Sequence, residues 1–239
     1  TKEKTLKRSN CASSNTMGLD PWIFIKDFFD RDASQVAKSL LGKIICVKHD
    51  DDWLKARIIE TEAYYLHEKA SHASLGFTEK RKPLFMPAGT IYMYYARGGD
   101  SLNVSVRGEG NAVLIKSGVP YGASKKMLST MQHLNPRKHS TRTREVMKLC
   151  SGQTLLCKAL GLKVSQWSGK QFDVDQFYFT DMQNPIENII QTTRLGIPKG
   201  RDETLQYRYI DQAYAQYCTD NPLHKRNWQE NRDYFILQE

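Results

Sequence analysis

The stretch Arg57-Ile58-Ile59-Glu60-Thr61-Glu62-Ala63-Tyr64 decides how this chain folds, because it carries two carboxylates within a strand-like run. The turn residues Asp50-Asp51-Asp52 precede it, which predicts a strand that folds back on the one before. Residues two apart on a strand share a face and lie roughly 6.6 Å apart along it. Glu60 and Glu62 can therefore project to one side, where two carboxylates perturb each other's pKa. The alternative is that both face solvent and pair with lysine or arginine.

A second segment predicts a β-hairpin with glycines at its tip: Ile91-Tyr92-Met93-Tyr94-Tyr95-Ala96-Arg97-Gly98-Gly99-Asp100-Ser101-Leu102-Asn103-Val104. Alternation places Tyr92 and Tyr94 on one face, and Asn103 lies on the polar side of the partner strand. This polar, aromatic face beside two carboxylates indicates a catalytic pocket next to a protruding hairpin. The alternative is that the tyrosines reflect ordinary β-propensity and that Asn103 faces solvent.

Titratable and aromatic side chains crowd into the dozen residues that follow the acidic strand. Tyr64 is followed by His67, Glu68, His72 and Ser74, and such crowding is typical of a functional site. His67 and His72 are five residues apart, not the four that places two imidazoles on one helical face. The H-x-E and P-C-x-x-C pattern of zinc deaminases is also missing. We therefore expect no metal.

Composition limits the class of protein. A chain of 239 residues with 40% apolar content can bury a substantial core. Thirty-five Lys and Arg against 26 Asp and Glu give a formal charge of +9, which attracts phosphate polyanions or an anionic membrane surface. No apolar run approaches the roughly 20 residues of a membrane span, and the first residues lack a signal peptide's apolar core, so we expect an intracellular protein. Five irregularly spaced cysteines without a C-x-x-C pair indicate reduced thiols.

The order of elements along the chain predicts one domain behind a basic arm. Thr1 to Gly18 mixes lysine and serine with almost nothing apolar, which predicts a flexible arm and leaves residues 19–239 as a single domain. The tail around Asn221-Pro222 is expected at the surface. Capping residues and apolar spacing predict helices from Asp32 or Ser34 to Leu41, over 123–134 and from Ser151 to Leu162, and strands over 44–47, 112–115, 172–179 and 205–210.

Several motifs together resemble the alkyladenine (3-methylpurine) DNA glycosylase family. They are A-R-I-I-E-T-E-A-Y, H-x-S, M-P-A-G-T-I-Y-M-Y and S-L-N-V-S, followed by L-C-S-G-Q-T-L-L-C-K-A-L-G-L from Leu149 and T-R-L-G-I from Thr193. The resemblance covers roughly residues 20 to 210. It implies an α+β fold: a single mixed domain built on a curled, mainly antiparallel sheet, with surrounding helices and a protruding DNA-binding hairpin. It also implies a monomer that needs no cofactor.

The resemblance implies a monofunctional DNA glycosylase of base excision repair. Such an enzyme flips alkylated or deaminated purines out of double-stranded DNA, among them 3-methyladenine, 7-methylguanine, hypoxanthine and ethenoadenine, and leaves an abasic site. Glu62 matches the catalytic carboxylate that activates water. Tyr64 and Tyr94 match the aromatics that sandwich the base, His72 matches a third wall, and Asn103 matches the side chain that obstructs the amino group of normal guanine. Glu60 is left as a supporting residue.

Two features depart from the family pattern and concern DNA contacts. The hairpin is about one residue shorter, so no tyrosine matches the aromatic that fills the gap left by the flipped nucleotide; Arg97 is our candidate for that place. Lys116 stands where relatives can carry arginine, and we expect a phosphate contact from it. The run 116–148 is strongly basic. The expected DNA-contact residues are Arg97, Lys116, Lys125, Lys126, Lys199 and Arg201.

Two other classes remain open at this point. A non-catalytic nucleic-acid-binding module would explain the charge and the tyrosines, but it would not need Glu62. A nucleoside hydrolase acting on small substrates would explain the carboxylates but not the basic flank, and its rate would be nearly indifferent to salt.

Overall fold

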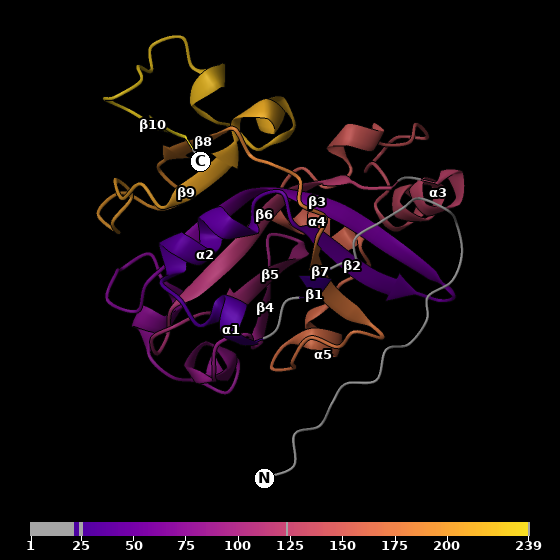
Figure 1. Ribbon diagram of the computed structural model, residues 1–239, viewed down its shortest axis with the longest axis horizontal. Helices are drawn as coiled ribbons and strands as arrows, with labels where there is room; N and C mark the ends of the chain where they lie inside the picture. Colours follow the sequence, from indigo (N-terminus) through magenta and orange to yellow (C-terminus); the bar gives the residue numbers. More distant parts are fainter. Residues whose placement is uncertain (1–21, 24–25, 123, 239) are drawn as a thin grey trace.

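A computed structural model describes residues 22–23, 26–122 and 124–238; the expected basic arm, residues 1–18, lies outside this part of the chain. The described residues form one open, mostly antiparallel sheet with several short helices around it, an α+β fold as expected (Figure 1). The strands are β1 (Trp22–Ile23), β2 (Ile44–His49), β3 (Asp52–Tyr64), β4 (Ile91–Ala96), β5 (Gly99–Ser105), β6 (Ala112–Pro120), β7 (Phe177–Asp181), β8 (Asn188–Thr192), β9 (Arg208–Asp211) and β10 (Phe235–Gln238). The α-helices are α1 (Lys26–Phe29), α2 (Ala33–Leu40), α3 (Lys125–Leu134), α4 (Gln153–Ala159) and α5 (Val164–Trp167).

Strand β3 is central in the sheet and pairs with three other strands, β2, β6 and β9. The sheet runs β1-β7-β2-β3-β6-β5-β4, and β9 also pairs with β3, followed outward by β8 and β10. Glu60 lies opposite Ser117 of β6 and Ile210 of β9, while Glu62 lies opposite Leu114 and Arg208. Both glutamates are 0% exposed, and side chains of β6 and β9 contact their carboxylates. The interpretation that both face solvent is therefore wrong.

A β-bulge interrupts the pairing of β3 with β6. Ile58 pairs with Gly118 and Glu60 with Ser117, but Thr61 pairs with Ile115, so Lys116 has no partner across the ladder. A bulge bends a strand and re-aims its side chains. Here it lets the successive side chains Lys116 and Ser117 both reach carboxylates of β3. The predicted strand over 112–115 was too short, because β6 continues through this bulge to Pro120.

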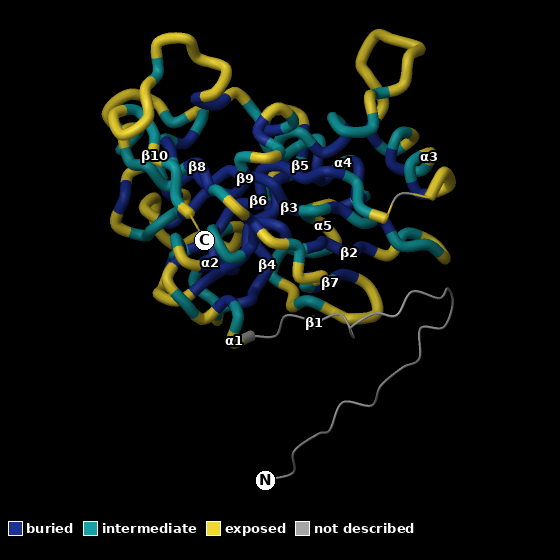
Figure 2. The backbone as a smooth tube through the Cα atoms, turned by 45° about the horizontal axis from the view of Figure 1, so that its top comes forward, coloured by how far each residue is buried: buried dark blue, intermediate teal, exposed yellow. Residues whose placement is uncertain are grey.

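Helix α2 covers one face of β3. Its N-terminus is capped by Asp32, which accepts from the amides of Ser34 and Gln35, and its apolar face is buried. The Thr61 hydroxyl donates to the Ala37 carbonyl at 2.7 Å, so alternate residues of β3 face α2 while Glu60 and Glu62 face away from it. Figure 1 shows α2 lying across one face of the sheet. Figure 2 shows the buried backbone gathered around β3, β5 and β6.

The β4–β5 hairpin turns at Arg97 and Gly98, not at the glycine pair. Both residues have positive φ, 53° and 79°, as a type I′ turn requires. Gly99 already belongs to β5, where a Cβ would lie 2.6 Å from the Thr154 side chain. The hairpin therefore packs closely against the first turn of α4.

The helix from Asp32 or Ser34 is confirmed as α2, and those over 123–134 and from Ser151 are confirmed as α3 and a shorter α4. The cap of α4 is Gly152, which offers no side-chain bond. The strands predicted over 172–179 and 205–210 are displaced to β7 and β9, and β8 and β10 were missed. Asn221 and Pro222 are buried, contrary to expectation, and the Asn221 amide is satisfied there because it donates to the carbonyls of Ala215 and Thr219.

The buried pair Arg208–Glu60, 3.1 Å apart, gives a test of this packing. We predict that Arg208→Met lowers the free energy of unfolding by about 3 to 5 kcal/mol, because Glu60 is left buried without its cation. Urea unfolding followed by circular dichroism measures the change. The control is Lys126→Met, which breaks the exposed Lys126–Asp52 pair and should change stability little. Equal losses in both variants would contradict the prediction.

Candidate active site

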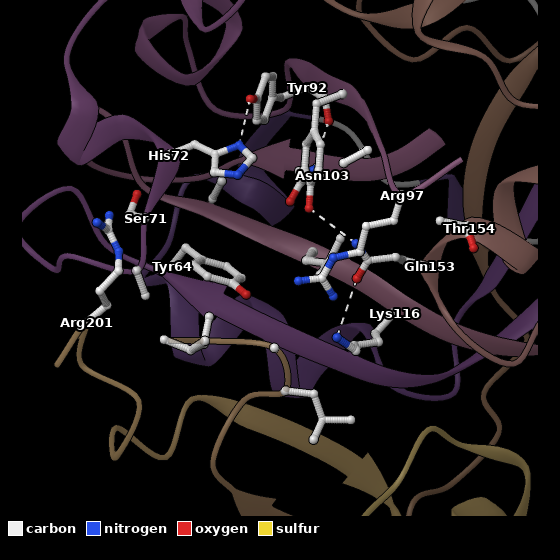
Figure 3. Close-up of a pocket in the computed structure, with 18 of the residues that line it drawn as sticks. Tyr64, Ser71, His72, Tyr92, Arg97, Asn103, Lys116, Gln153, Thr154 and Arg201 are labelled. Atoms are coloured by element: carbon white, nitrogen blue, oxygen red, sulfur yellow. Dashed lines mark hydrogen bonds between the residues drawn. The ribbon is translucent and has the colours of Figure 1, made fainter. Parts of the chain in front are cut away.

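One cavity of about 650 Å³ gathers most of the residues that the sequence singled out. Strands β3 to β6, the start of α4 and the segment 195–198 supply its walls (Figure 3). A pocket of this size suits a small ring system. The expected residues that line it are Tyr64, His72, Tyr94, Asn103, Arg97, Lys116 and Arg201.

Glu62 lies behind the pocket wall and is fully engaged. One carboxylate oxygen, Oε2, accepts the Tyr64 hydroxyl at 2.6 Å, and the other lies 3.0 Å from Lys116 Nζ. The Leu195 amide donates to that second oxygen at 3.4 Å. Burial raises the pKa of Glu62, but the Lys116 charge, the Tyr64 hydrogen bond and the Arg208 charge outweigh burial and hold this pKa below its ordinary value. Glu62 is therefore an anion at neutral pH.

Tyr64 forms one wall and is supported by a residue that sequence reasoning did not single out. The Arg194 guanidinium lies 4.5 Å from the centre of the Tyr64 ring and covers one of its faces. Arg194 is buried, pairs with Glu68 and donates to the Ala63 carbonyl at 2.9 Å. Burial first, and then the neighbouring Glu62 carboxylate, raise the pKa of Tyr64 well above its ordinary value. The motif T-R-L-G-I carried the only signal of Arg194 in the sequence.

The opposite wall is an aromatic cluster on β4 and the 72–75 turn. The rings of His72 and Tyr94 are 4.4 Å apart at 60°, and His72 Nδ1 lies 3.0 Å from the Tyr92 hydroxyl (Figure 3). The Asn103 amide donates to the Tyr92 carbonyl at 3.2 Å and is buried. The hairpin thus presents Tyr94 and Asn103 to the pocket, as its alternation predicted.

Gln153, the first residue of α4, connects Tyr94 to Lys116 and was not predicted. Its amide nitrogen lies 3.2 Å from the Tyr94 hydroxyl and 3.0 Å from Ser101 Oγ. Its carbonyl oxygen accepts from Lys116 at 3.4 Å. Only its place in the motif L-C-S-G-Q marked Gln153 in the sequence.

The six expected DNA-contact residues fall into three groups. Arg97 and Arg201 lie at the pocket, and Lys199 is exposed in the same turn as Arg201. Lys116 is only 7% exposed and is held by Glu62, so the structure places it inside the site and not on the surface where a phosphate would lie. Lys125 and Lys126 are exposed on α3, outside the pocket lining, and Lys126 pairs with Asp52.

Two features are absent from the part of the chain that the structure describes: a cluster of metal ligands and a membrane-spanning helix. In residues 22–23, 26–122 and 124–238, no three His, Cys, Asp or Glu side chains are grouped so that they could bind a metal ion. Within the same ranges, no helix has the length and apolar character to cross a membrane.

The pKa of His72 provides a test of how far the pocket removes this imidazole from water. Burial first, and then the Arg81 charge, lower the pKa of His72 from its ordinary value of about 6.5. We predict a lowered midpoint in an NMR titration of this imidazole, and a partial rise in Arg81→Gln, because burial persists. The exposed Lys82→Gln is the control. Since the folded pKa is depressed, the stability that His72 contributes is present above its unfolded pKa and is lost as pH falls through the folded one. A midpoint at or above 6.5 would refute the prediction.

Comparison with known proteins identifies the family. The family model for methylpurine-DNA glycosylase matches residues 27–215. A protein of Pseudomonas fluorescens (strain Pf0-1), provisionally named a 3-methyladenine DNA glycosylase, is 59% identical over 232 residues, 96% of this chain and 100% of that protein. A protein with the same provisional name from Pseudomonas aeruginosa (strain UCBPP-PA14) is 57% identical over 213 residues, 88% of each chain. Another, from Clostridium beijerinckii, is 34% identical over 185 residues, 73% of this chain and 88% of that protein. The chain therefore belongs to the methylpurine-DNA glycosylase family and is a DNA glycosylase, a hydrolase.

Proposed function

We propose that this glycosylase works as a monomer inside the cell and removes alkylated or deaminated purines from double-stranded DNA. It hydrolyses the N-glycosidic bond, cleaves no strand and leaves an abasic site. One observation carries the proposal: an ionised carboxylate, Glu62, lies behind the wall of the pocket and accepts a hydrogen bond from Tyr64, and the pocket itself lies between the aromatic walls formed by Tyr64 and by His72 with Tyr94.

The walls fit a flipped purine. Extruding a base from the duplex costs a few kcal/mol, and stacking on an aromatic returns about 1–3 kcal/mol per base. Tyr64 and Tyr94 together can therefore offset the flip. Because Arg194 covers the outer face of Tyr64, that ring is fixed before the base arrives. Lesions that pair or stack poorly lose less on leaving the duplex, which favours them over normal bases.

Glu62 acts on the water that attacks the sugar. As the C1′–N bond breaks, its electron pair leaves with the base and the sugar gains oxocarbenium character. The Glu62 carboxylate stabilises that positive charge and takes a proton from the water whose oxygen bonds to C1′. Lys116 supports this role because its charge keeps the buried Glu62 deprotonated.

The selectivity for damaged over normal purines follows from the same pocket walls. N-alkylated purines are cationic, so the faces of Tyr64 and Tyr94 attract them. Asn103 is fixed by its hydrogen bond to the Tyr92 carbonyl, and there it obstructs the exocyclic amino group of normal guanine. A normal guanine would have to displace a buried, bonded amide, and this costs binding free energy.

Arg97 is the proposed occupant of the gap that the flipped nucleotide leaves. It lies at the tip of the hairpin, is exposed, and lines the mouth of the pocket. Its guanidinium is close to Gly196, where an added Cβ would lie 3.2 Å from Nη1. A flat cation at this point can stack on bases and bond to them in the minor groove.

The first test is Glu62→Gln, which keeps the size of the side chain and removes its charge. We expect base release from duplexes with one ethenoadenine, hypoxanthine or 7-methylguanine to fall to the detection limit, while lesion binding persists. Alkaline strand scission reports the abasic sites. Glu109→Gln, at an exposed turn, should retain full activity. If neither wild type nor Glu62→Gln released a base but both bound lesions equally, the protein would be a recognition module.

The second test concerns the hairpin tip. Arg97→Ala should weaken binding to a lesion duplex more than Arg107→Ala does, because Arg107 lies away from the pocket and pairs with Asp30. Fluorescence anisotropy at fixed salt measures both. Equal losses would contradict the proposal that Arg97 fills the gap left by the flipped nucleotide.

A further inference from the structure

Gln153 has every polar atom of its side chain engaged inside the pocket. Its NH₂ group donates to the hydroxyls of Tyr94 and Ser101, and its oxygen accepts from Lys116. No hydrogen-bonding capacity is left to read a base by direct donation. We infer that Gln153 is a positioning residue for hydrolysis, which holds the Lys116 ammonium against Glu62 and ties that pair to Tyr94. This inference rests on the proposed function.

The Lys116 ammonium needs a second acceptor to stay where it is. Lysine carries a compact charge on a flexible four-carbon stem, so a single contact leaves it free to swing. Glu62 Oε1 lies 3.0 Å from Nζ and Gln153 Oε1 lies 3.4 Å from it. Figure 3 shows the ammonium directed toward Gln153 across the pocket. Without this oxygen, Lys116 could turn toward the open cavity and the phosphates of bound DNA, and Glu62 would lose the charge that offsets its burial.

The nitrogen of the same amide fixes the other wall. The Tyr94 hydroxyl is held by Gln153, and the Tyr94 ring packs on His72. One planar amide therefore joins the surface that receives the base to the carboxylate that activates the water. Rates of hydrolysis depend steeply on the distance between such groups, and a misplacement of about 1 Å can cost roughly 100-fold.

The backbone under Gln153 is fixed by a buried network. Ser117 Oγ accepts the Gly152 amide at 2.9 Å and donates to Glu60 at 2.6 Å. Glu60 also accepts the hydroxyl of Thr219 at 2.7 Å and pairs with Arg208. Gly152 precedes Gln153 and Ser117 follows Lys116, so one hydrogen bond aligns the two residues that must meet.

The β6 bulge makes this alignment possible. It directs Lys116 to Glu62 and the next residue, Ser117, to Glu60. A regular strand would send these successive side chains to opposite faces. The Glu60 network therefore has a functional consequence beyond stability, because it sets the place from which Gln153 reaches Lys116.

The test compares Gln153→Met, which keeps the length but not the hydrogen bonds, with Gln153→Asn, which keeps the amide but is too short. Gln166→Met, exposed on α5, is the matched control. Single-turnover release of 7-methylguanine at saturating enzyme gives the chemical rate, and anisotropy gives Kd. We expect both Gln153 variants to lose roughly 10- to 100-fold in rate with Kd within about threefold of wild type. Gln166→Met should match wild type in both.

A second readout needs no activity. NMR titration of ¹³C-labelled glutamate, assigned with Glu62→Gln, should show the pKa of Glu62 raised in both Gln153 variants, because Lys116 has moved while burial, the Arg208 charge and the Tyr64 hydrogen bond remain. Rates within about twofold of wild type together with an unchanged Glu62 pKa would overturn the inference. If wild type released no base, the proposed function would fail, and the titration would still decide whether Gln153 holds Lys116.

Discussion

The contact between Lys116 and Glu62 is the interaction on which the site depends. A carboxylate removed from water prefers to take up a proton, and Glu62 is 0% exposed. The Lys116 ammonium, 3.0 Å away, does most to keep it anionic, together with the Tyr64 hydrogen bond and the Arg208 charge. A buried charge pair is stable only when the other bonding positions of both partners are filled. Here Tyr64 and Leu195 bond to Glu62, and Gln153 accepts from Lys116.

The sheet is built so that this pair can exist. Strand β3 has neighbours on both edges at Glu60 and Glu62, and side chains from those neighbours, Lys116 and Ser117 of β6 and Arg208 of β9, contact the two buried carboxylates. The two carboxylates have different partners: Glu62 lies behind the pocket wall and bonds to Tyr64 and Lys116, while Glu60 bonds to Ser117 of β6 and to Thr219, and Ser117 in turn accepts the amide of Gly152 before α4. Thr219 lies beyond the residues that the family model matches, so the C-terminal segment also supports the site.

Local pattern predicted much of this arrangement. The two-residue alternation of β3 and of the hairpin is a property of neighbouring residues, and it placed Glu60 with Glu62 and Tyr92 with Tyr94 on shared faces; that Tyr64, Tyr94 and Asn103 surround one base was implied by the family resemblance. The caps and apolar spacing of α2 were equally local. What escaped prediction depends on residues far apart: Arg194 on Tyr64, and Gln153 between Lys116 and Tyr94. Lys116 itself was assigned to the surface, because a basic residue at a strand end gives no sign of a bulge.

The most direct measurement of the central claim is the pH dependence of single-turnover 7-methylguanine release in wild type and in Lys116→Met. If an ionised Glu62 drives hydrolysis, the wild-type rate stays level down to about pH 5, since the pKa of Glu62 lies below the ordinary glutamate value of about 4.3. In Lys116→Met the acidic limb should move to higher pH, because burial then dominates. A wild-type rate that already falls between pH 7 and 5, with a limb that Lys116→Met leaves in place, would contradict this account and assign control to another group.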